Sequence, residues 1–136
     1  EGYCSDMTRT VANGKVSEEQ KRVYDTVLAA QLAALDAVKA GADCAGIDAV
    51  ARSIIVEAGY GDAFGHALGH GVGVQIHEEP RLSMRSEQVL ADNMDVTVEP
   101  GIYLSGKFGV RIEDLVVVNG ENPLNLSHFQ KELRII

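Results

Sequence analysis

The sequence has few of the features that mark membrane, disulfide-linked or nucleic-acid-binding proteins. Its 136 residues contain no apolar run of about 18 residues, the length that a membrane-spanning helix needs. The net charge is -8 and the Lys and Arg residues form no cluster, whereas phosphate binding requires a basic surface. We therefore expect neither a membrane nor a nucleic acid among the partners of the chain.

Cysteine is also scarce, since only Cys4 and Cys44 are present. Their spacing matches neither a C-x-x-C redox motif nor a set of zinc ligands, so we interpret both as free thiols. Free thiols are typical of reducing compartments, which favours a cytoplasmic protein. The sequence starts at Glu1 without an initiator Met or a charged and apolar leader, so any targeting segment is expected to be absent or to lie outside it.

The composition that is present resembles that of an ordinary globular domain. Apolar residues make up 46% of the chain and charged residues 24%. The length corresponds to about one domain. No repeat, low-complexity run or linker divides the sequence, so residues 1–136 are treated as one unit.

Two helices are predicted in the first half of the chain. Ser17 and Gln20 form a capping-box pattern, and the helix that they begin is expected to end near Lys39. A second helix is expected to begin after Asp43 and to end at Gly59. Helical spacing predicts that the buried residues are Val23, Val27, Ala30, Ala34 and Val38 in the first helix, and Ile47, Val50, Ala51, Ile54, Ile55 and Ala58 in the second.

The other segments have the pattern of β-strands. Strands are predicted at residues 3–12, 72–76, 94–99, 101–104 and 109–118. A turn at Ser105-Gly106-Lys107 is expected to join the last two. This order of elements predicts an α+β fold, in which two helices cover one face of a curved antiparallel sheet.

Three of the four histidines, His66, His70 and His77, fall within one glycine-rich run. Glycines on both sides of His70 leave room for a ligand or substrate to approach the backbone closely. A single histidine of this kind would be interpreted as a hydrogen-bonded structural residue. The cluster with its glycines favours a binding or metal site instead.

Three carboxylates, Asp6, Glu99 and Glu113, lie in β-like segments. A carboxylate that faces the core is costly unless it meets a cation or hydrogen-bond donors, although on a solvent face each would be an ordinary surface charge. Arg111 shares a strand face with Glu113 and is placed to support the same site. Carboxylates with one imidazole are the ligands of a hard divalent ion or of a pair of such ions, which can share a bridging hydroxide.

These residues resemble the pita-bread metallopeptidases, and most closely their aminopeptidase P and prolidase branch. The resemblance rests on residues 2–10 (Gly-Tyr-Cys-Ser-Asp-Met-Thr-Arg-Thr), 65–73 (Gly-His-Ala-Leu-Gly-His-Gly-Val-Gly), 77–80 (His-Glu-Glu-Pro), 98–103 (Val-Glu-Pro-Gly-Ile-Tyr) and 109–114 (Gly-Val-Arg-Ile-Glu-Asp). It implies that residues 1–136 are the C-terminal part of a pita-bread catalytic domain whose N-terminal part is missing from the sequence.

The resemblance also implies a metal site. It assigns four metal ligands in this sequence, namely Asp6, His70, Glu99 and Glu113. It places one further aspartate ligand ahead of Glu1 and implies two divalent ions, of Mn, Co or Zn. We therefore expect the chain by itself to be depleted of metal, holding it weakly or at one position only, and to be inactive.

The implied reaction is hydrolysis of the bond before proline, as in an Xaa-Pro aminopeptidase or an Xaa-Pro dipeptidase, by a hydroxide that bridges the two ions. The substrate is then a peptide with proline at its second position. The resemblance makes His66 and His77 the groups that bind the substrate carbonyl and the developing oxyanion. It makes Glu99 a proton carrier as well as a ligand, and Arg111 a residue that orients the ligand carboxylates.

Other members of the family define the alternatives. Methionine aminopeptidases lack the Arg-Ile-Glu-Asp arrangement, and creatinase does not use this full set of ligands. The alternative function is a non-catalytic pita-bread domain that binds peptide or protein partners. Retention of all four ligand positions counts against it, and metal analysis would separate the two.

The segment at residues 3–12 also predicts an oligomeric state. An open and fairly apolar strand edge is a template for pairing with another chain. We expect a homodimer that buries Tyr3, Met7 and Val11 at a two-fold interface.

Overall fold

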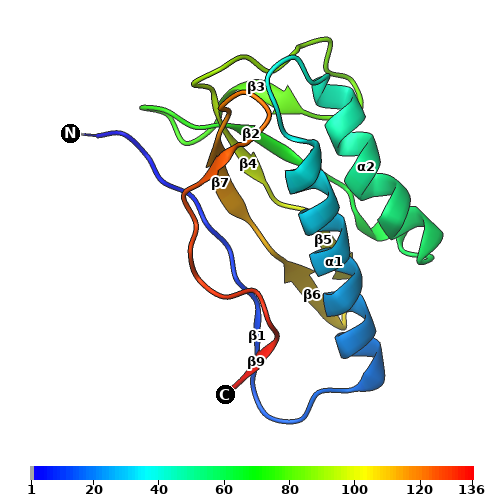
Figure 1. Cartoon of the computed structure of the whole chain (residues 1–136). Coiled ribbons are helices and arrows are strands. Elements are labelled where there is room, and N and C mark those ends of the chain that lie inside the picture. Colours follow the sequence, from blue (N-terminus) through cyan, green and yellow to red (C-terminus); the bar gives the residue numbers. More distant parts are fainter. Residues whose placement is uncertain (1) are drawn as a thin grey trace.

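Two helices lie side by side over one face of an antiparallel sheet (Figure 1). The computed structural model describes residues 2–136. The elements in chain order are β1 (Val11–Ala12), α1 (Glu18–Ala37), α2 (Cys44–Glu57), the short 3-10 helix η1 (Gly61–Ala63), β2 (Gly69–Gly71), β3 (Glu78–Leu82), β4 (Asp95–Val98), β5 (Gly101–Leu104), β6 (Phe108–Arg111), β7 (Asp114–Val117), β8 (Leu124–Asn125) and β9 (Arg134–Ile135).

Helix α1 begins and packs as its sequence predicts. The Gln20 amide donates to Ser17 Oγ at 3.2 Å, and the Ser17 amide donates to Gln20 Oε1 at 2.8 Å, which completes the capping box. All five apolar residues expected on its inner face are fully buried, including Val38, which caps its C-terminal end. These side chains form the centre of the core beneath the sheet.

Helix α2 is capped by Asp43, whose carboxylate accepts the Gly46 amide at 2.7 Å. Burial along this helix differs in part from the expectation. Ile47, Ala51 and Ile55 are buried, Val50 and Ile54 are half-buried, and Ala58 is exposed. A charged residue, Asp48, is fully buried on the inner face instead.

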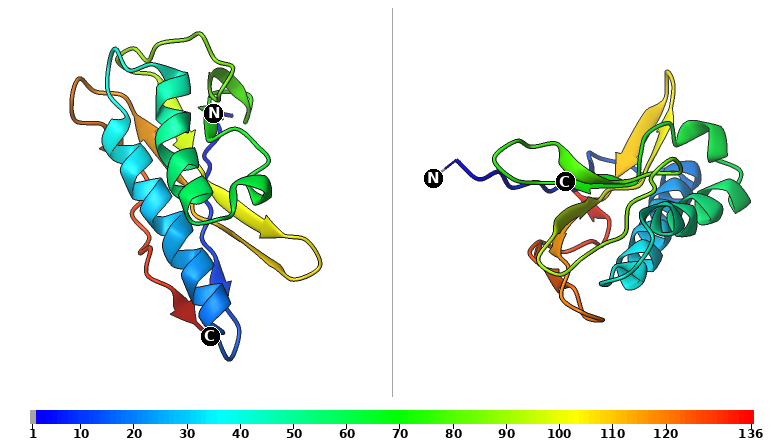
Figure 2. Two further views of the ribbon diagram at one scale, coloured as in Figure 1. Left: turned by 90° about the vertical axis from the view of Figure 1, so that its right-hand side faces the viewer. Right: turned by 90° about the horizontal axis from the view of Figure 1, so that it is seen from above.

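The main sheet has five strands in the order β3-β2-β4-β7-β8, and every neighbouring pair is antiparallel. Strands β5 and β6 form a separate hairpin that extends away from this sheet (Figure 2). The expected turn at Ser105-Gly106-Lys107 closes the hairpin, where the Lys107 amide donates to the Leu104 carbonyl and Gly106 has a φ of 73°.

The strands predicted at residues 94–99 and 101–104 are confirmed as β4 and β5, but the single strand predicted at 109–118 is wrong. It divides into β6 in the hairpin and β7 in the main sheet, with Ile112 and Glu113 between them. Glu99 occupies the equivalent break between β4 and β5. Both glutamates therefore lie where the chain passes from one sheet to the other.

Two further strand predictions are wrong in extent. Residues 72–76 form the loop between β2 and β3, and Val74 is 73% exposed, because the chain reverses there and the Glu78 side chain accepts the Gln75 amide. Of residues 3–12, only Val11 and Ala12 belong to a strand, which pairs in parallel with β9.

Both cysteines are free thiols, with Cys44 buried and Cys4 half-buried. Within the described residues, neither α1 nor α2 is both long enough and apolar enough to cross a membrane.

Candidate metal centre

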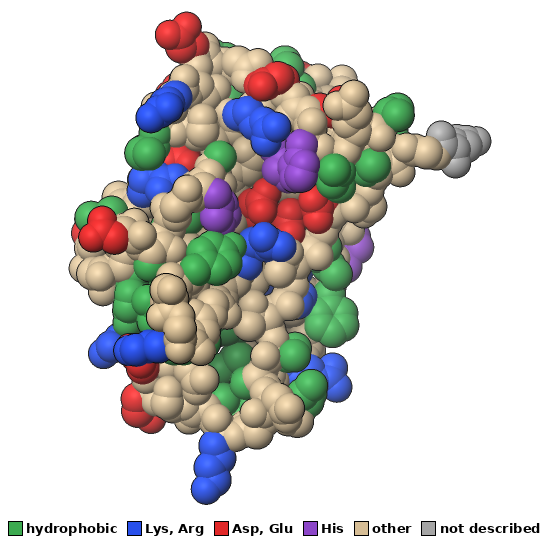
Figure 3. Space-filling view, turned by 180° about the vertical axis from the view of Figure 1, so that it is seen from behind, with side chains coloured by type: hydrophobic (Ala, Val, Ile, Leu, Met, Phe, Trp, Pro, Cys, Tyr) green, Lys and Arg blue, Asp and Glu red, His purple; other side chains and the backbone are tan. Residues whose placement is uncertain are grey.

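A group of acidic side chains lies on the face of the molecule away from the viewer of Figure 1, flanked by two histidines and by basic side chains (Figure 3). Four elements supply it. Asp6 comes from the N-terminal extended segment and His70 from β2, while Glu99 and Glu113 occupy the two breaks between the sheets. The sheet brings the two glutamates to one level, because Val98 pairs with Asp114 and Gly101 pairs with Arg111.

The four carboxylate and imidazole groups assigned from the sequence meet at this point. One ligand atom each from Asp6, His70 and Glu113 lies within 4.8 Å of the others. Glu99 Oε1 is 3.0 Å from His70 Nε2, and Asp6 Oδ2 is 3.8 Å from the same nitrogen. The structure thus gathers three carboxylates around one imidazole.

The His70 ring is oriented by a backbone contact. Its Nδ1 lies 2.9 Å from the Gly71 carbonyl, and because a carbonyl only accepts, Nδ1 carries the hydrogen and Nε2 faces the carboxylates. Burial lowers the His70 pKa, but the hydrogen bonds to Glu99 and to the Gly71 carbonyl, with the charges of Glu99 and Asp6, outweigh it and raise the pKa overall.

Glu113 is 2% exposed and incompletely satisfied. Thr8 Oγ1 donates to Glu113 Oε2, but Oε1 has no hydrogen-bond partner among residues 2–136. The Glu113 pKa is raised to about 7, mainly by burial and also by the charges of Glu99 and Asp6. The Thr8 hydrogen bond and the Arg111 charge lower this pKa, but by less. A buried carboxylate of this kind requires either a proton or a cation.

Glu99 has the opposite balance. Burial raises the Glu99 pKa, but the hydrogen bonds from His70 and from the Thr97 hydroxyl at 3.0 Å lower it by a larger amount. The Glu99 pKa is therefore below its ordinary value. The same Thr97 hydroxyl accepts the His70 amide at 3.0 Å. Thr97 therefore connects the backbone of β2 to the Glu99 carboxylate.

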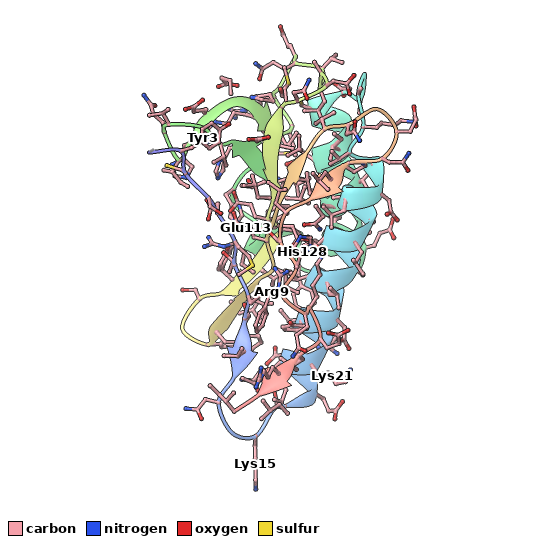
Figure 4. All side chains as sticks on the ribbon, turned by 60° about the vertical axis from the view of Figure 1, so that its left-hand side comes forward. Tyr3, Arg9, Lys15, Lys21, Glu113 and His128 are labelled. Carbon is pink, nitrogen blue, oxygen red and sulfur yellow. The ribbon has the colours of Figure 1, made fainter. Side chains whose placement is uncertain are left out.

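Arg111 approaches Glu113 through an intermediate residue. Its Nε donates to Thr8 Oγ1 at 3.1 Å, and the Thr8 hydroxyl in turn donates to Glu113. Arg9 binds the backbone of the same glutamate, because its Nη1 donates to the Glu113 carbonyl at 2.6 Å. Figure 4 shows Arg9 close to Glu113. The expected role of Arg111 in orienting a ligand carboxylate thus has a route in the structure.

The two other histidines of the glycine-rich run, His66 and His77, lie beside the candidate ligands. The exposed His77 ring packs edge-on against the His70 ring, with centroids 4.4 Å apart. His66 Nδ1 donates to the Ala67 carbonyl at 2.7 Å, and His66 Nε2 lies 2.9 Å from the Tyr103 hydroxyl, which donates to it. His66 is therefore paired with Tyr103 rather than with a ligand residue.

The residues present fit a divalent cation. The group combines three carboxylates with a single imidazole whose Nε2 faces them and can bind a cation once its hydrogen is displaced, a donor set suited to hard or borderline divalent ions. The unpaired Glu113 Oε1 also lies in this group, where a cation would supply the interaction that the described residues do not.

Sequence reasoning missed Thr8, Thr97 and Tyr103 as parts of this site. Thr8 follows Asp6 by two positions, so an extended segment places both on one face, and this signal was available. Thr97 precedes Glu99 by the same spacing. Tyr103 lies in the quoted stretch 98–103, but nothing in that pattern indicates its contact with His66.

The chain is similar to known metallopeptidases. Residues 1–120 match the protein family described as "Metallopeptidase family M24". The Xaa-Pro dipeptidase of Pyrococcus furiosus is 47% identical over 131 residues, which are 96% of this chain and 38% of that protein. Solved structures include an Xaa-Pro dipeptidase from Bacillus anthracis (50% identical, TM-score 0.97) and an X-Pro aminopeptidase from Thermotoga maritima (46% identical, TM-score 0.95), each covering 99% of this chain and matched over 38% of its own length.

The chain thus spans about 38% of the length of the relatives that it matches. Its match to these peptidases confirms the expected α+β pita-bread fold, of which it covers the C-terminal portion. The extent of the family match, together with identities near 50% to named Xaa-Pro dipeptidases, shows that the chain belongs to metallopeptidase family M24.

Proposed function

We propose that this chain supplies the metal-binding part of an Xaa-Pro peptidase, with residues 1–136 forming the C-terminal part of its catalytic domain. The observation that carries the proposal is the convergence of Asp6, His70, Glu99 and Glu113 from four separate segments. The names of the relatives support the substrate class, since they are Xaa-Pro dipeptidases and an X-Pro aminopeptidase.

Membership of this family implies the use of a divalent metal ion. In our proposal two ions, of Mn, Co or Zn, are held by these four side chains together with one aspartate from outside the sequence. Such ions would, when bound, supply a nucleophilic hydroxide and polarise the carbonyl under attack. His70 enters as a neutral ligand through Nε2, because Nδ1 is committed to the Gly71 carbonyl.

The remaining polar residues position substrate and move protons. Glu99 would accept a proton from the attacking water and pass it to the leaving nitrogen of proline, and the Thr97 hydroxyl, 3.0 Å from Glu99 Oε1, holds its carboxylate in place. Only Nε2 of His66 is left to meet the substrate, because Nδ1 donates to the Ala67 carbonyl, and Nε2 binds a carbonyl or an oxyanion when it carries a hydrogen as well. His77 lies exposed beside His70 and would be the second group to bind the substrate carbonyl or the developing oxyanion.

Metal binding by the chain is the first test. Titration with Co²⁺, followed by its visible absorption, is expected to give saturable but weak binding, because one ligand is supplied from elsewhere. His70→Ala and Glu113→Gln are expected to remove the signal, whereas Asp62→Asn, which changes an exposed carboxylate on η1, should leave it unchanged. Equal binding by all four proteins would contradict the proposed site.

Activity is tested in a chimera in which this chain replaces the matching segment of the Bacillus anthracis Xaa-Pro dipeptidase. The Mn²⁺-loaded chimera should cleave Ala-Pro or Ala-Pro-Ala, and the chain alone should cleave neither. Glu99→Gln should abolish turnover, and His66→Ala should lower it about 100-fold. A chimera that binds Mn²⁺ fully but hydrolyses neither peptide would favour the non-catalytic alternative.

A further inference from the structure

A charged pair on the buried face of α2 lies outside the set of metal ligands. Asp48 and Arg52 are one helical turn apart, and their side chains are 0% and 16% exposed. Arg52 Nε donates to Asp48 Oδ2 at 2.7 Å and Arg52 Nη2 donates to Asp48 Oδ1 at 2.9 Å, so the two planar groups meet through two parallel hydrogen bonds.

The same two side chains hold the irregular segment at residues 64–68. Arg52 Nη1 donates to the Phe64 carbonyl at 2.9 Å, and Arg52 Nη2 donates to the His66 carbonyl at 2.9 Å. Asp48 Oδ1 accepts the Leu68 amide at 3.1 Å. The pair therefore fixes backbone groups of three alternate residues in a segment that has no helix or strand of its own.

An aromatic contact adds to these hydrogen bonds. The Arg52 guanidinium lies 4.1 Å from the centroid of the Phe64 ring, and that ring meets the His66 ring edge-on with centroids 5.1 Å apart. An isolated buried ion pair contributes little to stability, because desolvation offsets its attraction. Here the donors of Arg52 that Asp48 does not use are directed at the segment that carries His66.

The position of this segment determines how His66 is presented. Its Nδ1 bonds the carbonyl of the next residue, Ala67, so the backbone at residues 66 and 67 sets both the orientation of the ring and the nitrogen that carries hydrogen. Nε2 is thereby turned toward the Tyr103 hydroxyl. We propose that Asp48 and Arg52 are positioning residues that fix the orientation and the Nδ1–H tautomer of His66, a role in substrate binding that rests on the proposed peptidase function.

The test measures the tautomer of His66 in the metal-free chain, using ¹³C and ¹⁵N chemical shifts of labelled histidine rings. Arg52→Lys keeps the charge but cannot make the two parallel hydrogen bonds of the guanidinium. Asp48→Asn keeps the size of the side chain but loses its charge. Both are expected to shift His66 from the Nδ1–H form toward the Nε2–H form that free histidine prefers. His70 and the exposed His128 should keep their wild-type shifts.

The matched control is Lys21→Met, which removes an exposed pair of the same i,i+4 spacing on α1, where Lys21 Nζ and Asp25 are 2.6 Å apart. It should leave all ring shifts unchanged. Wild-type His66 shifts in either folded variant of the Asp48–Arg52 pair would overturn the proposal. Global unfolding of both variants would also overturn it, in favour of a role in holding the whole domain.

This readout does not depend on peptidase activity. If the Mn²⁺-loaded chimera proves active, Arg52→Lys in it should lower kcat about 10-fold without changing its metal content. An inactive chimera with the expected tautomer shifts would reject the proposed function and leave the positioning of His66 intact. An active chimera, together with His66 chemical shifts that the Asp48 and Arg52 variants leave unchanged, would support the proposed function and reject the positioning of His66.

Discussion

At the scale of single residues, Glu113 has the least favourable environment for an ionised side chain. It is buried, it faces Asp6 and Glu99, and one of its oxygens has no partner among the described residues. Thr8 and Arg111 compensate for this only in part. The metal-free protein is therefore expected to be destabilised by its own ligand set, and bound cations should offset that cost.

Glu113→Gln is expected to change how the stability of the metal-free protein depends on pH. The folded protein retains the Glu113 proton up to a pKa of about 7, whereas the unfolded chain loses it near the ordinary value of about 4.3. The contribution of this group to stability therefore falls as the pH rises through that window. The substitution should remove the fall and raise the free energy of unfolding at pH about 8 in EDTA, by up to about 3 kcal/mol.

The measurement is urea denaturation at several pH values, with and without Mn²⁺. Glu87→Gln, which changes an exposed carboxylate, should follow the wild type throughout. With Mn²⁺ the wild type should be more stable than Glu113→Gln, because the variant lacks one of the proposed metal ligands. A variant less stable than the wild type at the high pH in EDTA would show that the Glu113 carboxylate is already balanced without metal.

Residue-scale features were predictable to different degrees. The four candidate ligand positions, which the structure brings together, could be named because each has a characteristic local motif. Asp48 could not, since its spacing with Ile47 and Ala51 predicts only an inner helix face, and a carboxylate there is explained solely by Arg52 and the Leu68 amide. Contacts of this kind depend on the path of a loop, which residue spacing does not determine.

At the scale of elements, strand β2 shows how glycine allows two neighbours to approach His70. A Cβ on Gly69 would collide with the Thr97 carbonyl of β4, and a Cβ on Gly71 would collide with the Glu79 carbonyl of β3. The sequence suggested that these glycines leave room for a ligand or substrate. The structure shows that they leave room for the adjacent strands.

Gly69→Ala is accordingly expected to destabilise the fold by roughly 1–3 kcal/mol, because backbone atoms of β4 must move. The shift should also displace His70 and weaken Co²⁺ binding. Gly65→Ala is the matched control, since a Cβ at Gly65 meets no atom within 4 Å. Thermal unfolding and Co²⁺ titration of both variants check this, and equal values for the two would refute the steric explanation.

The helices and strands could be predicted where the spacing of apolar residues follows a single helical or strand period along the whole element. Both helices and strands β4 and β5 follow their apolar patterns. The predicted strand at 109–118 failed because its alternation continues across Glu113, although the backbone leaves one sheet and enters another there. Alternation records which residues face inward, but it does not record which sheet they belong to.

At the scale of the whole molecule, segments distant in sequence converge behind the metal centre. Asp114 accepts hydrogen bonds from Arg9 Nη2 at 2.8 Å and from Lys131 Nζ at 2.5 Å, and Lys131 also contacts Gln31 of α1 at 3.0 Å. Burial raises the Asp114 pKa, but these partners and Asn125 lower it overall. This network joins both ends of the chain to β7, and no local pattern could have predicted it.

The N-terminal segment in this network leaves one edge open. Its backbone bonds to the rest of the domain include those of the Cys4 amide with Gly73 and of the Thr8 carbonyl with Glu113. Tyr3 and Met7 are 63% and 47% exposed, and Val11 in β1 is 45% exposed, although the Tyr3 hydroxyl donates to Asp95 Oδ2 at 2.8 Å. An extended segment that exposes apolar side chains favours pairing with a second copy.

We therefore expect the chain to form a two-fold dimer through this segment, or to exchange it between copies. Light scattering after size-exclusion chromatography, at tens of micromolar, should give twice the chain mass of 14.6 kDa. Met7→Lys should give monomers, because a charge on an open edge opposes pairing. Leu32→Lys, at an exposed position on α1, should remain dimeric. A wild-type chain of monomeric mass at every concentration would exclude this interface, and its exposed apolar residues would then need a different partner.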